Sequence, residues 1–457
     1  MATRHTPPVS SSFDTSVPAV VLKLRHSVVH YGGLGAIRSL GRLGIPVYAV
    51  CEGRMAPPAA SKYLSGGFVW ETTSDASKNP ERLLDGLMTI GERVGDRSLL
   101  VATDDAAAVF VAEHGHELQR RFLFPRPPAG LPRSLASKRG LYQLCNRLGI
   151  PCPKAVFPTS RGHVEEFLET AVFPVVVKGA EPWLLPIGVG VRSTSIVHTP
   201  DHLLDLYRRV ERHQATGLLF QEYIPPEAAE DWFFHGYCDA ASECLVGFTG
   251  RKLRSYPAHA GPTSLGRWVL NEELRQEAEA LFRAISFRGI MDLDYRLDLR
   301  DGRYKLLDFN PRLGAQFRLF EDDNGIDVVR AMHLDLTGRP VSKGRAMPGR
   351  GFIVENHDPL AVWQYRRDGG MTLRAWLRSL FGVREAAWFA SDDPVPFLAM
   401  CGRFLLTRAL PGRRHPASTP ADRVAQPRYV RGRRQSRHRL NMAATATVST
   451  RPIDEPR

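Results

Sequence analysis

The stretch that most constrains this fold is MDLDYRLDLRDGRYKLLDFNPRLGAQFRLF, residues 291–320. Polar and apolar residues alternate on both sides of Asp301-Gly302. Because successive side chains of a strand point to opposite faces, this alternation predicts two β-strands. An Asp-Gly pair between them is typical of a hairpin turn. The chain is therefore expected to contain a hairpin whose polar face carries several acids.

The loop length of this hairpin decides where its acids lie. A two-residue loop would place Asp308 opposite Tyr295, on the apolar face. A three-residue loop, from Arg300 to a left-handed Gly302, avoids this, and we expect it. Asp294 then lies opposite Asp308, and Asp292 opposite Asn310. In the second strand, alternation places Tyr304 and Leu306 on the same face as Asp308 and Asn310.

Opposed carboxylates repel each other, which costs a few tenths to about 1 kcal/mol for a cross-strand pair. A bound cation would compensate for this repulsion. The oxygen ligands of Asp294, Asp308 and Asn310 suit Mg²⁺, which completes its shell with water and nucleotide phosphates. The hairpin thus predicts a metal and phosphate site. A solvated strand face is the alternative for the hairpin taken alone.

The length, composition and net charge of the chain limit the class of protein to which it can belong. A chain of 457 residues with 43% hydrophobic residues is long enough for two or three domains. Of the net charge of +13, +8 belongs to residues 411–457, so the rest is only mildly basic. The six cysteines include no CxxC pair, which is typical of reduced thiols. No apolar run approaches the roughly 20 residues of a membrane span, and no signal peptide is recognisable, so we expect a cytoplasmic protein.

Secondary-structure patterns divide the chain into two kinds of module. Residues 19–52 predict a strand, a helix and a strand, and SLLVATDD predicts a further buried strand that ends in acids. A proline-rich linker follows at 124–132. From about residue 131, helices alternate with strands that read as a largely antiparallel sheet. The predicted fold class is therefore α/β followed by α+β.

Several cations recur at strand ends and beside the hairpin. Lys138 stands in ASKRGLYQLCNRLGIPCPK, Lys178 ends FPVVVKG, and Arg312 follows the hairpin in NPR. Lys252 and Arg254 alternate along GRKLR, so we expect them to form a cationic pair that suits a triphosphate or an acyl phosphate. With the hairpin acids, this set resembles the ATP-grasp superfamily, and within it the carboxylate-amine ligases of the D-aspartate ligase type.

The resemblance covers about residues 20 to 400 and implies an ATP-grasp fold with an N-terminal Rossmann-like domain. The implied domains are a flexible N-terminus (1–17), an α/β domain (18–125), an ATP-grasp module (131–350, with a small subdomain at 131–175), a closing segment (351–409) and a basic disordered tail (410–457).

The resemblance also implies the roles of individual residues. ATP would be bound by Lys138, Lys178, Gly188, Gly190, Gln221, Glu222, Tyr223 and Ile224, with Glu230 or Asp231 on the ribose. Metal would be held by Asp294, Asp308 and Asn310, and the transferred phosphate would be met by Lys252, Arg254 and Arg312. Gly33, Thr103, Asp104 and Arg296 are the candidates for contact with the substrates.

By this resemblance the protein joins a carboxylate to an amine through an acyl phosphate and releases ADP and phosphate. The implied cofactors are ATP and Mg²⁺ or Mn²⁺, with two ions. The implied partners are small-molecule carboxylate and amine substrates, without specific nucleic acid or a membrane span, and a homodimer is compatible with the sequence. Two positions depart from the family pattern: Asp308 stands where glutamate is commoner, and Asp292 where some relatives carry arginine.

The sequence is compatible with two other functions. Gly32, Gly33 and Gly35, with Glu52 after the second strand, suggest a nucleotide- or dinucleotide-binding protein without ligase activity, although the fingerprint lacks its third glycine. This alternative leaves the hairpin acids unexplained. A nucleic-acid-binding role would depend on the basic tail alone.

Overall fold

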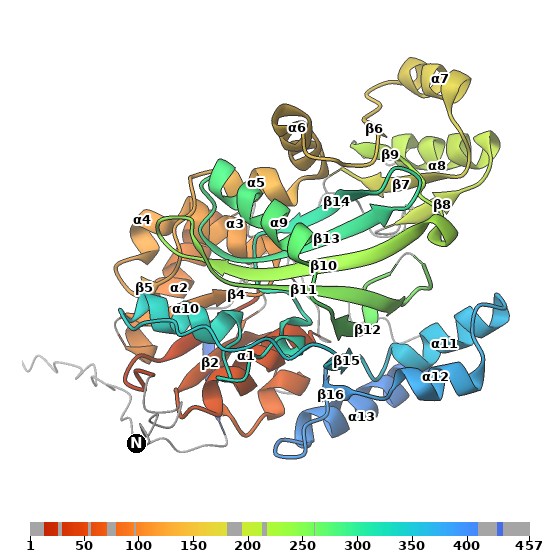
Figure 1. The fold of residues 1–457 in the computed structure, drawn as a ribbon. Coiled ribbons are helices and arrows are strands. Elements are labelled where there is room, and N and C mark those ends of the chain that lie inside the picture. The colour runs from red at the N-terminus through yellow and green to blue at the C-terminus, as the bar shows by residue number, and fades with distance from the viewer. Residues whose placement is uncertain are drawn as a thin grey trace, which may run out of the picture.

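The computed structural model describes residues 13–25, 30–53, 56–70, 79–95, 97–180, 194–212, 217–259, 261–409 and 427–432. Three sheets organise these residues (Figure 1). The N-terminal sheet and a small four-stranded sheet lie on either side of a long, twisted seven-stranded sheet. No helix among the described residues is long and apolar enough to cross a membrane.

The N-terminal sheet has the strand order β17-β3-β2-β1-β4-β5, in which β17 spans Arg428–Arg431. Its parallel strands are β1 (Ala19–Leu22), β2 (Val47–Cys51), β3 (Leu64–Val69), β4 (Ser98–Ala102) and β5 (Phe122–Leu123). The helices are α1 (Tyr31–Gly41), α2 (Pro80–Val94), α3 (Asp105–Glu113) and α4 (Gly115–Leu118). The strands and the helix predicted within residues 19–52 and 98–105 are confirmed. β3 and α2 were not predicted.

The C-terminal tail was predicted to be disordered, and this prediction is wrong for one segment. β17 (Arg428–Arg431) pairs antiparallel with β3 and adds an edge strand to the N-terminal sheet. The ring of Tyr429 packs against Phe68, with 5.6 Å between the ring centroids. Pairing with a preformed sheet edge supplies hydrogen-bond partners that the composition of the tail does not reveal.

The four-stranded sheet follows the linker and has the order β6-β9-β7-β8. Its strands are β6 (Ala155–Val156), β7 (Val175–Gly179), β8 (Ser195–Val197) and β9 (Leu218–Glu222). Helices α5 (Leu131–Ala136) and α6 (Lys138–Leu148) precede it, and α7 (Arg161–Thr170) and α8 (Pro200–Arg212) pack on it through a valine, leucine and phenylalanine core. The predicted glycine loop with Gly188 and Gly190 lies outside the described residues.

The seven-stranded sheet has the order β14-β13-β10-β11-β12-β15-β16. Its strands are β10 (Ala229–Cys238), β11 (Cys244–Ser255), β12 (Thr263–Trp268), β13 (Gly289–Asp298), β14 (Arg303–Asn310), β15 (Gly351–Ile353) and β16 (Val383–Ala386). Helix α9 (Glu272–Ala284) covers one face, where Phe282 packs among Phe234, Leu293 and Phe309. Helix α10 (Val328–Leu336) packs on the other face with α1.

The predicted hairpin exists, but its turn differs from the prediction. Asp298 pairs with Arg303, so the loop has four residues, Leu299–Gly302, rather than three. Gly302 is left-handed as predicted, with φ +70°. A bulge at Leu307 then shifts the second strand by one residue and restores the predicted pairs Asp294 with Asp308 and Asp292 with Asn310.

The prediction of which residues share a face of the second strand is wrong, because the bulge interrupts the alternation of side chains. Tyr304 and Leu306 point into the core beneath α9 together with Phe309, instead of sharing a face with Asp308 and Asn310. Apolar side chains therefore fill one face on both sides of the bulge, while the acids keep the other.

The segment 351–409, predicted as a closing segment, joins the large sheet through β15 (Gly351–Ile353) and β16 (Val383–Ala386). Its helices are α11 (Asp358–Arg367), α12 (Leu373–Ser379) and α13 (Val395–Ala409). The motif VENHDP, residues 354–359, holds this segment in place. Glu355 accepts hydrogen bonds from the amides of Trp388 and Phe389, and Asn356 accepts one from the Trp388 indole at 3.0 Å.

An ion-pair network ties the segment after the hairpin to α10 and the C-terminal strands. Glu321 contacts Arg318 at 2.8 Å, Arg330 at 2.9 Å and Arg350 at 3.1 Å. Burial alone would raise the pKa of Glu321, but the three guanidinium groups outweigh it and lower the pKa from 4.5 to about 2.

This depressed pKa makes folding stability depend on pH. Because the folded-state pKa lies below the unfolded one, Glu321 stabilises the fold above pH 4.5, and this contribution disappears as the pH falls towards 2. A shift of this size corresponds to about 3 kcal/mol. Urea unfolding at pH 7 and pH 3 is expected to show a smaller difference for Glu321→Gln than for the wild type, with the exposed-acid variant Asp368→Asn following the wild type. Equal differences for all three proteins would contradict this.

Candidate active site

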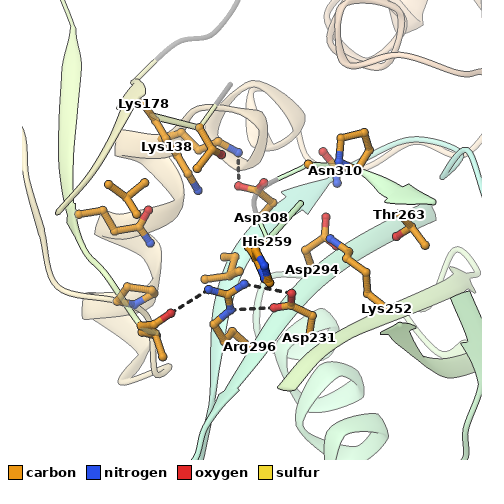
Figure 2. A pocket seen from close by; sticks show the side chains of 18 of the residues that line it. Lys138, Lys178, Asp231, Lys252, His259, Thr263, Asp294, Arg296, Asp308 and Asn310 are labelled. Atoms are coloured by element: carbon orange, nitrogen blue, oxygen red, sulfur yellow. Dashed lines mark hydrogen bonds and ion pairs between the residues drawn. The ribbon is translucent and has the colours of Figure 1, made fainter. Parts of the chain in front are cut away.

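A cavity of about 410 Å³ lies between the four-stranded sheet and the seven-stranded sheet. β7, β8, β9 and α6 line one side, and β10, β11, β13 and β14 line the other. Figure 2 shows charged side chains from both sides pointing into it. The predicted site residues found in its lining are Lys138, Lys178, Gln221, Glu222, Tyr223, Ile224, Asp231, Lys252, Asp294, Arg296, Asp308, Asn310 and Arg312.

The opposed acids of the hairpin each meet a lysine in this cavity. Lys138, at the first position of α6, forms an ion pair with Asp308 (Figure 2). Lys252, on β11, lies with its Nζ 3.3 Å from Oδ1 of Asp294. The amide nitrogen of Asn310 donates to the main-chain oxygen of Asp292 at 3.1 Å, which leaves its amide oxygen as the end able to ligate.

The pKa values in the cavity reflect its crowded charges. Burial raises the pKa of Asp294, and the carboxylates of Asp292 and Asp308 raise it further against the opposing effect of Lys252. Burial also acts to raise the pKa of Asp308, but Lys138 and Lys178 outweigh it, so the net shift is downward. Burial lowers the pKa of Lys178. The lysines therefore compensate much of the negative charge in the site, but the two opposed carboxylates still repel each other.

The donor set suits a hard cation. Two opposed carboxylates, of which Asp308 raises the pKa of Asp294, form with the amide oxygen beside them a partial oxygen shell of the kind that Mg²⁺ accepts. The described residues contain no cluster of three or more histidine, cysteine or acidic side chains that could hold a metal. A metal at this site would consequently take its remaining ligands from water or from a bound phosphate.

Asp231 and Arg296 organise the end of the cavity next to β9. Nε and Nη2 of Arg296 contact the two carboxylate oxygens of Asp231 at 2.7 and 3.0 Å, and Nη1 donates to the main-chain oxygen of Ile224 at 3.0 Å (Figure 2). Glu230 projects from the opposite face of β10, where it contacts Arg251 and Trp232. Of the two acids, Asp231 thus lines the cavity and Glu230 does not.

Arg312 lies at the far end of the cavity, between two carboxylates. Its Nη1 is 2.8 Å from Oδ2 of Asp292, and its Nε is 3.3 Å from Oδ1 of Asp105, the first residue of α3. The N-terminal domain therefore contacts the site through Asp105, one of the two acids that end the motif SLLVATDD.

Arg254 was predicted to face phosphate beside Lys252, and this prediction is wrong. Bulges in β11 after Lys252 break the alternation, and Arg254 is 2% exposed behind the cavity wall. Its Nε and Nη2 contact both oxygens of Asp358 at 2.8 and 2.9 Å, and its Nη1 contacts Ser379 at 2.6 Å. Arg254 thus anchors the C-terminal segment.

Three candidate substrate residues also have structural partners outside the cavity lining. Asp104 caps α3 by accepting from Ala107 and also accepts from the amides of Leu24 and Arg25. The Thr103 hydroxyl donates to the main-chain oxygen of Leu22 at 3.0 Å. Gly33 lies in α1 and, with Thr103, lines a separate small cavity. The candidate that does line the main cavity is Arg296.

The glycine pattern that suggested a dinucleotide loop has a packing cause. A Cβ on Gly35 would lie 2.9 Å from the Phe317 ring, and one on Gly32 would lie 3.0 Å from Cα of Ala315. The glycines let α1 approach the segment after the hairpin closely. Glu52, the acid of the same pattern, forms an ion pair with Lys23.

Sequence reasoning missed several lining residues, among them Tyr31, His259, Thr263 and Gln316. Gln316 could have been found, because it follows Arg312 by four residues in the segment after the hairpin. Tyr31 and His259 approach from segments far away in the sequence, and no local pattern marks them.

Comparison with known proteins supports the fold and the similarity to ligases. The chain is 27% identical over 297 residues to a D-aspartate ligase of Enterococcus faecium, covering 62% of this chain and 68% of that protein. It is 20% identical over 196 residues to a carbamoyl phosphate synthase large chain of Methanoculleus marisnigri, 41% of this chain and 17% of that protein. No family model matches the chain.

Solved structures show the same fold at low identity. N5-carboxyaminoimidazole synthetase of Staphylococcus aureus in complex with ADP superposes with a TM-score of 0.55, at 8% identity over 74% of this chain and 82% of that one. The biotin carboxylase domain of Hydrogenobacter thermophilus 2-oxoglutarate carboxylase, in complex with MgADP and bicarbonate, gives 0.54, at 15% identity over 73% of each chain. Both similarities concern the fold.

Proposed function

Since the chain has the ATP-grasp fold and is similar in sequence to a D-aspartate ligase, we propose that it is an ATP-dependent carboxylate-amine ligase. The observation that carries this proposal is the convergence of the opposed acids Asp294 and Asp308, with Asn310, and five lysine and arginine side chains in one cavity between two sheets. A simple binding protein would have no need to bring two carboxylates into opposition. A site that aligns and neutralises phosphates would.

In this proposal the cations of the cavity bind and orient the triphosphate. Lys138 and Lys178 meet it from the side of the four-stranded sheet, and Lys252 and Arg312 from the large sheet. Their role is to offset charge as the terminal phosphate passes to the substrate carboxylate, because phosphoryl transfer depends on positioning and electrostatic stabilisation. The amine then attacks the acyl phosphate, the amide bond forms, and phosphate leaves.

Asp294, Asp308 and Asn310 would hold Mg²⁺, and two ions are proposed. When bound, Mg²⁺ supplies charge neutralisation on the β- and γ-phosphates. The protein residues prepare this place. Asp294 and Asp308 present opposed oxygens, and Lys138 and Lys252 hold these carboxylates in position.

The adenosine would lie beside Gln221, Glu222, Tyr223 and Ile224, with Asp231 near the ribose. We also propose that the carboxylate is an amino acid, with D-aspartate as the first candidate because the similar ligase bears its name. We also propose domains at residues 18–125, 131–350 and 351–409, with an edge strand at Arg428–Arg431 in the basic tail.

The proposal is tested by measuring ADP and phosphate release from ATP and Mg²⁺ across pools of amino acids and small amines. Release that requires one acid and one amine, in equal amounts with a new amide, is expected. Tight nucleotide binding without turnover in any pool would favour the rival, a nucleotide-binding protein. No described glycine pattern supports that rival, because Gly32 and Gly35 serve the packing of α1.

The two adjacent acids of β10 provide a matched pair for testing the ribose site. Asp231→Asn is expected to raise the KM for ATP about tenfold, in line with the loss of a charged hydrogen bond. Glu230→Gln should leave this KM within about twofold, because its side chain lies on the other face of the strand. Steady-state kinetics at varied ATP concentration measure the KM of both variants. A larger increase in KM for Glu230→Gln than for Asp231→Asn would assign the ribose contact to Glu230.

A further inference from the structure

His235 is the most conspicuous buried polar side chain that the proposed mechanism does not use. It lies in the middle of β10 and has no solvent exposure. Its ring packs near those of Phe233 and Phe320, with centroid separations of 5.7 and 5.4 Å. Neither ring nitrogen makes a hydrogen bond with the described residues. Burying such groups without partners is costly, so its retention calls for an explanation.

The side chain that His235 faces is Asp292, its partner across β10 and β13. Nε2 of His235 lies 3.3 Å from Oδ1 of Asp292, and that oxygen is also buried without a hydrogen bond. A small adjustment joins the two into an N–H···O bond, which satisfies both atoms. Burial lowers the pKa of His235 despite the opposing effect of Asp292, which favours the neutral ring with one N–H to donate.

Asp292 connects this buried pair to the cavity. Its second oxygen, Oδ2, accepts from Nη1 of Arg312 at 2.8 Å. On its other side, Arg312 lies 3.3 Å from Asp105. One end of the Asp292 carboxylate therefore faces His235 and the other orients the guanidinium, so its rotation would disturb both contacts.

The loop after the hairpin fixes the ring of His235 in this place. A Cβ on Gly314 would lie 2.1 Å from Cε1 of His235 and 2.8 Å from Cγ of Asp292. Gly314 stands two residues after Arg312, so the loop that carries the arginine also packs its backbone against the ring. The arrangement couples the position of His235 to that of the loop.

We propose that His235 is a positioning residue that fixes Asp292 and, through it, aims Arg312 at the phosphate that is transferred. This inference rests on the proposed function, in which Arg312 meets that phosphate. By the family resemblance, some relatives carry an arginine where this chain has Asp292, so the carboxylate here requires a partner that holds it in position. His235 supplies it.

The test uses nucleotide binding, so that it does not depend on finding the substrates. Calorimetry with Mg²⁺ and either ADP or the non-hydrolysable analogue AMPPNP gives a ratio of affinities that reports contact with the γ-phosphate. The wild type is expected to prefer AMPPNP, and Arg312→Ala to lose this preference. His235→Phe keeps an aromatic ring but removes the N–H. It is expected to lower the preference about tenfold, which is the smaller of the effects seen when a residue that orients a ligating group is removed. ADP affinity should stay within about twofold.

Two further variants separate positioning from core packing. His235→Gln, which retains an N–H donor, should restore most of the preference. Asp292→Asn should reproduce the loss without a change in the aromatic core, and its combination with His235→Phe should add little, because the two act in series. A His235→Phe protein with a lower melting temperature and an unchanged preference for AMPPNP would overturn the inference. A double variant whose loss of preference equals the product of the two single losses would also overturn it.

The outcomes also distinguish this inference from the proposed function. A wild type that binds neither nucleotide would contradict the function itself. A wild type that binds both, without any preference for AMPPNP, would leave nucleotide binding intact and overturn the placement of Arg312 on the γ-phosphate, and with it the role of His235.

Discussion

Asp308→Ala is expected to lower the rate of ADP formation by about 10²- to 10³-fold, the range seen when one electrostatic contact to a transition state is removed. The physical reason is the position of Asp308. It opposes Asp294 across the hairpin and holds Lys138, so its removal disrupts the metal site and the orientation of a phosphate cation together. The measurement is a coupled assay of ADP release at saturating ATP, Mg²⁺ and substrates.

The matched control is Asp301→Ala, in the turn of the same hairpin. Its carboxylate is 42% exposed and pairs with Lys305 at 3.2 Å, away from the cavity. Lys305 keeps its closer ion pair with Asp298 at 2.6 Å when the exposed Asp301 is removed, so activity within about twofold of the wild type is expected. Both variants should keep their circular dichroism spectra. Near wild-type ADP formation by folded Asp308→Ala would remove the basis for the metal assignment.

Arg254→Ala is expected to lower the free energy of unfolding by about 3 to 5 kcal/mol, the cost of leaving one member of a buried ion pair without its partner. Asp358 is fully buried and would lose both contacts to the guanidinium, which it receives at 2.8 and 2.9 Å. The α11 end of the C-terminal segment should loosen with it. Urea unfolding followed by tryptophan fluorescence measures the effect.

Lys252→Ala provides the contrast, since Lys252 lies two residues away on the same strand. It should reduce ADP formation about 10²-fold, as expected for a lost phosphate contact. Its unfolding free energy should change by about 1 kcal/mol or less, because Lys252 faces an open cavity. If Arg254→Ala instead unfolded like the wild type and lost turnover, Arg254 would belong to the phosphate site after all.

The hairpin shows what local patterns can predict. Its acid pairs were predicted correctly although the loop was predicted one residue too short, because the bulge at Leu307 shifts the register back by one. A sign of this bulge exists in the sequence: the apolar positions Tyr304 and Leu306 are two apart, while Phe309 follows three later. In a strand with one apolar face, this change in the spacing of apolar residues from two to three indicates an inserted residue.

Residues whose role depends on contacts distant in sequence were beyond such patterns. Alternation placed Arg254 beside Lys252, but its partner Asp358 comes from a helix about a hundred residues later. Asp104 looked like a substrate ligand at the end of a strand, yet it caps α3. In both cases a buried or capping partner decided the role, and neither partner can be identified from local sequence.

The most direct test of the central claim is isotope transfer with an ¹⁸O-labelled carboxylate substrate. D-aspartate is the first candidate, followed by each acid that the pooled assay identifies. If the carboxylate is activated as an acyl phosphate, one labelled oxygen must pass to the released phosphate, and mass spectrometry should detect singly labelled phosphate in equal amounts with ADP. Unlabelled phosphate, or AMP as the nucleotide product, would contradict the account.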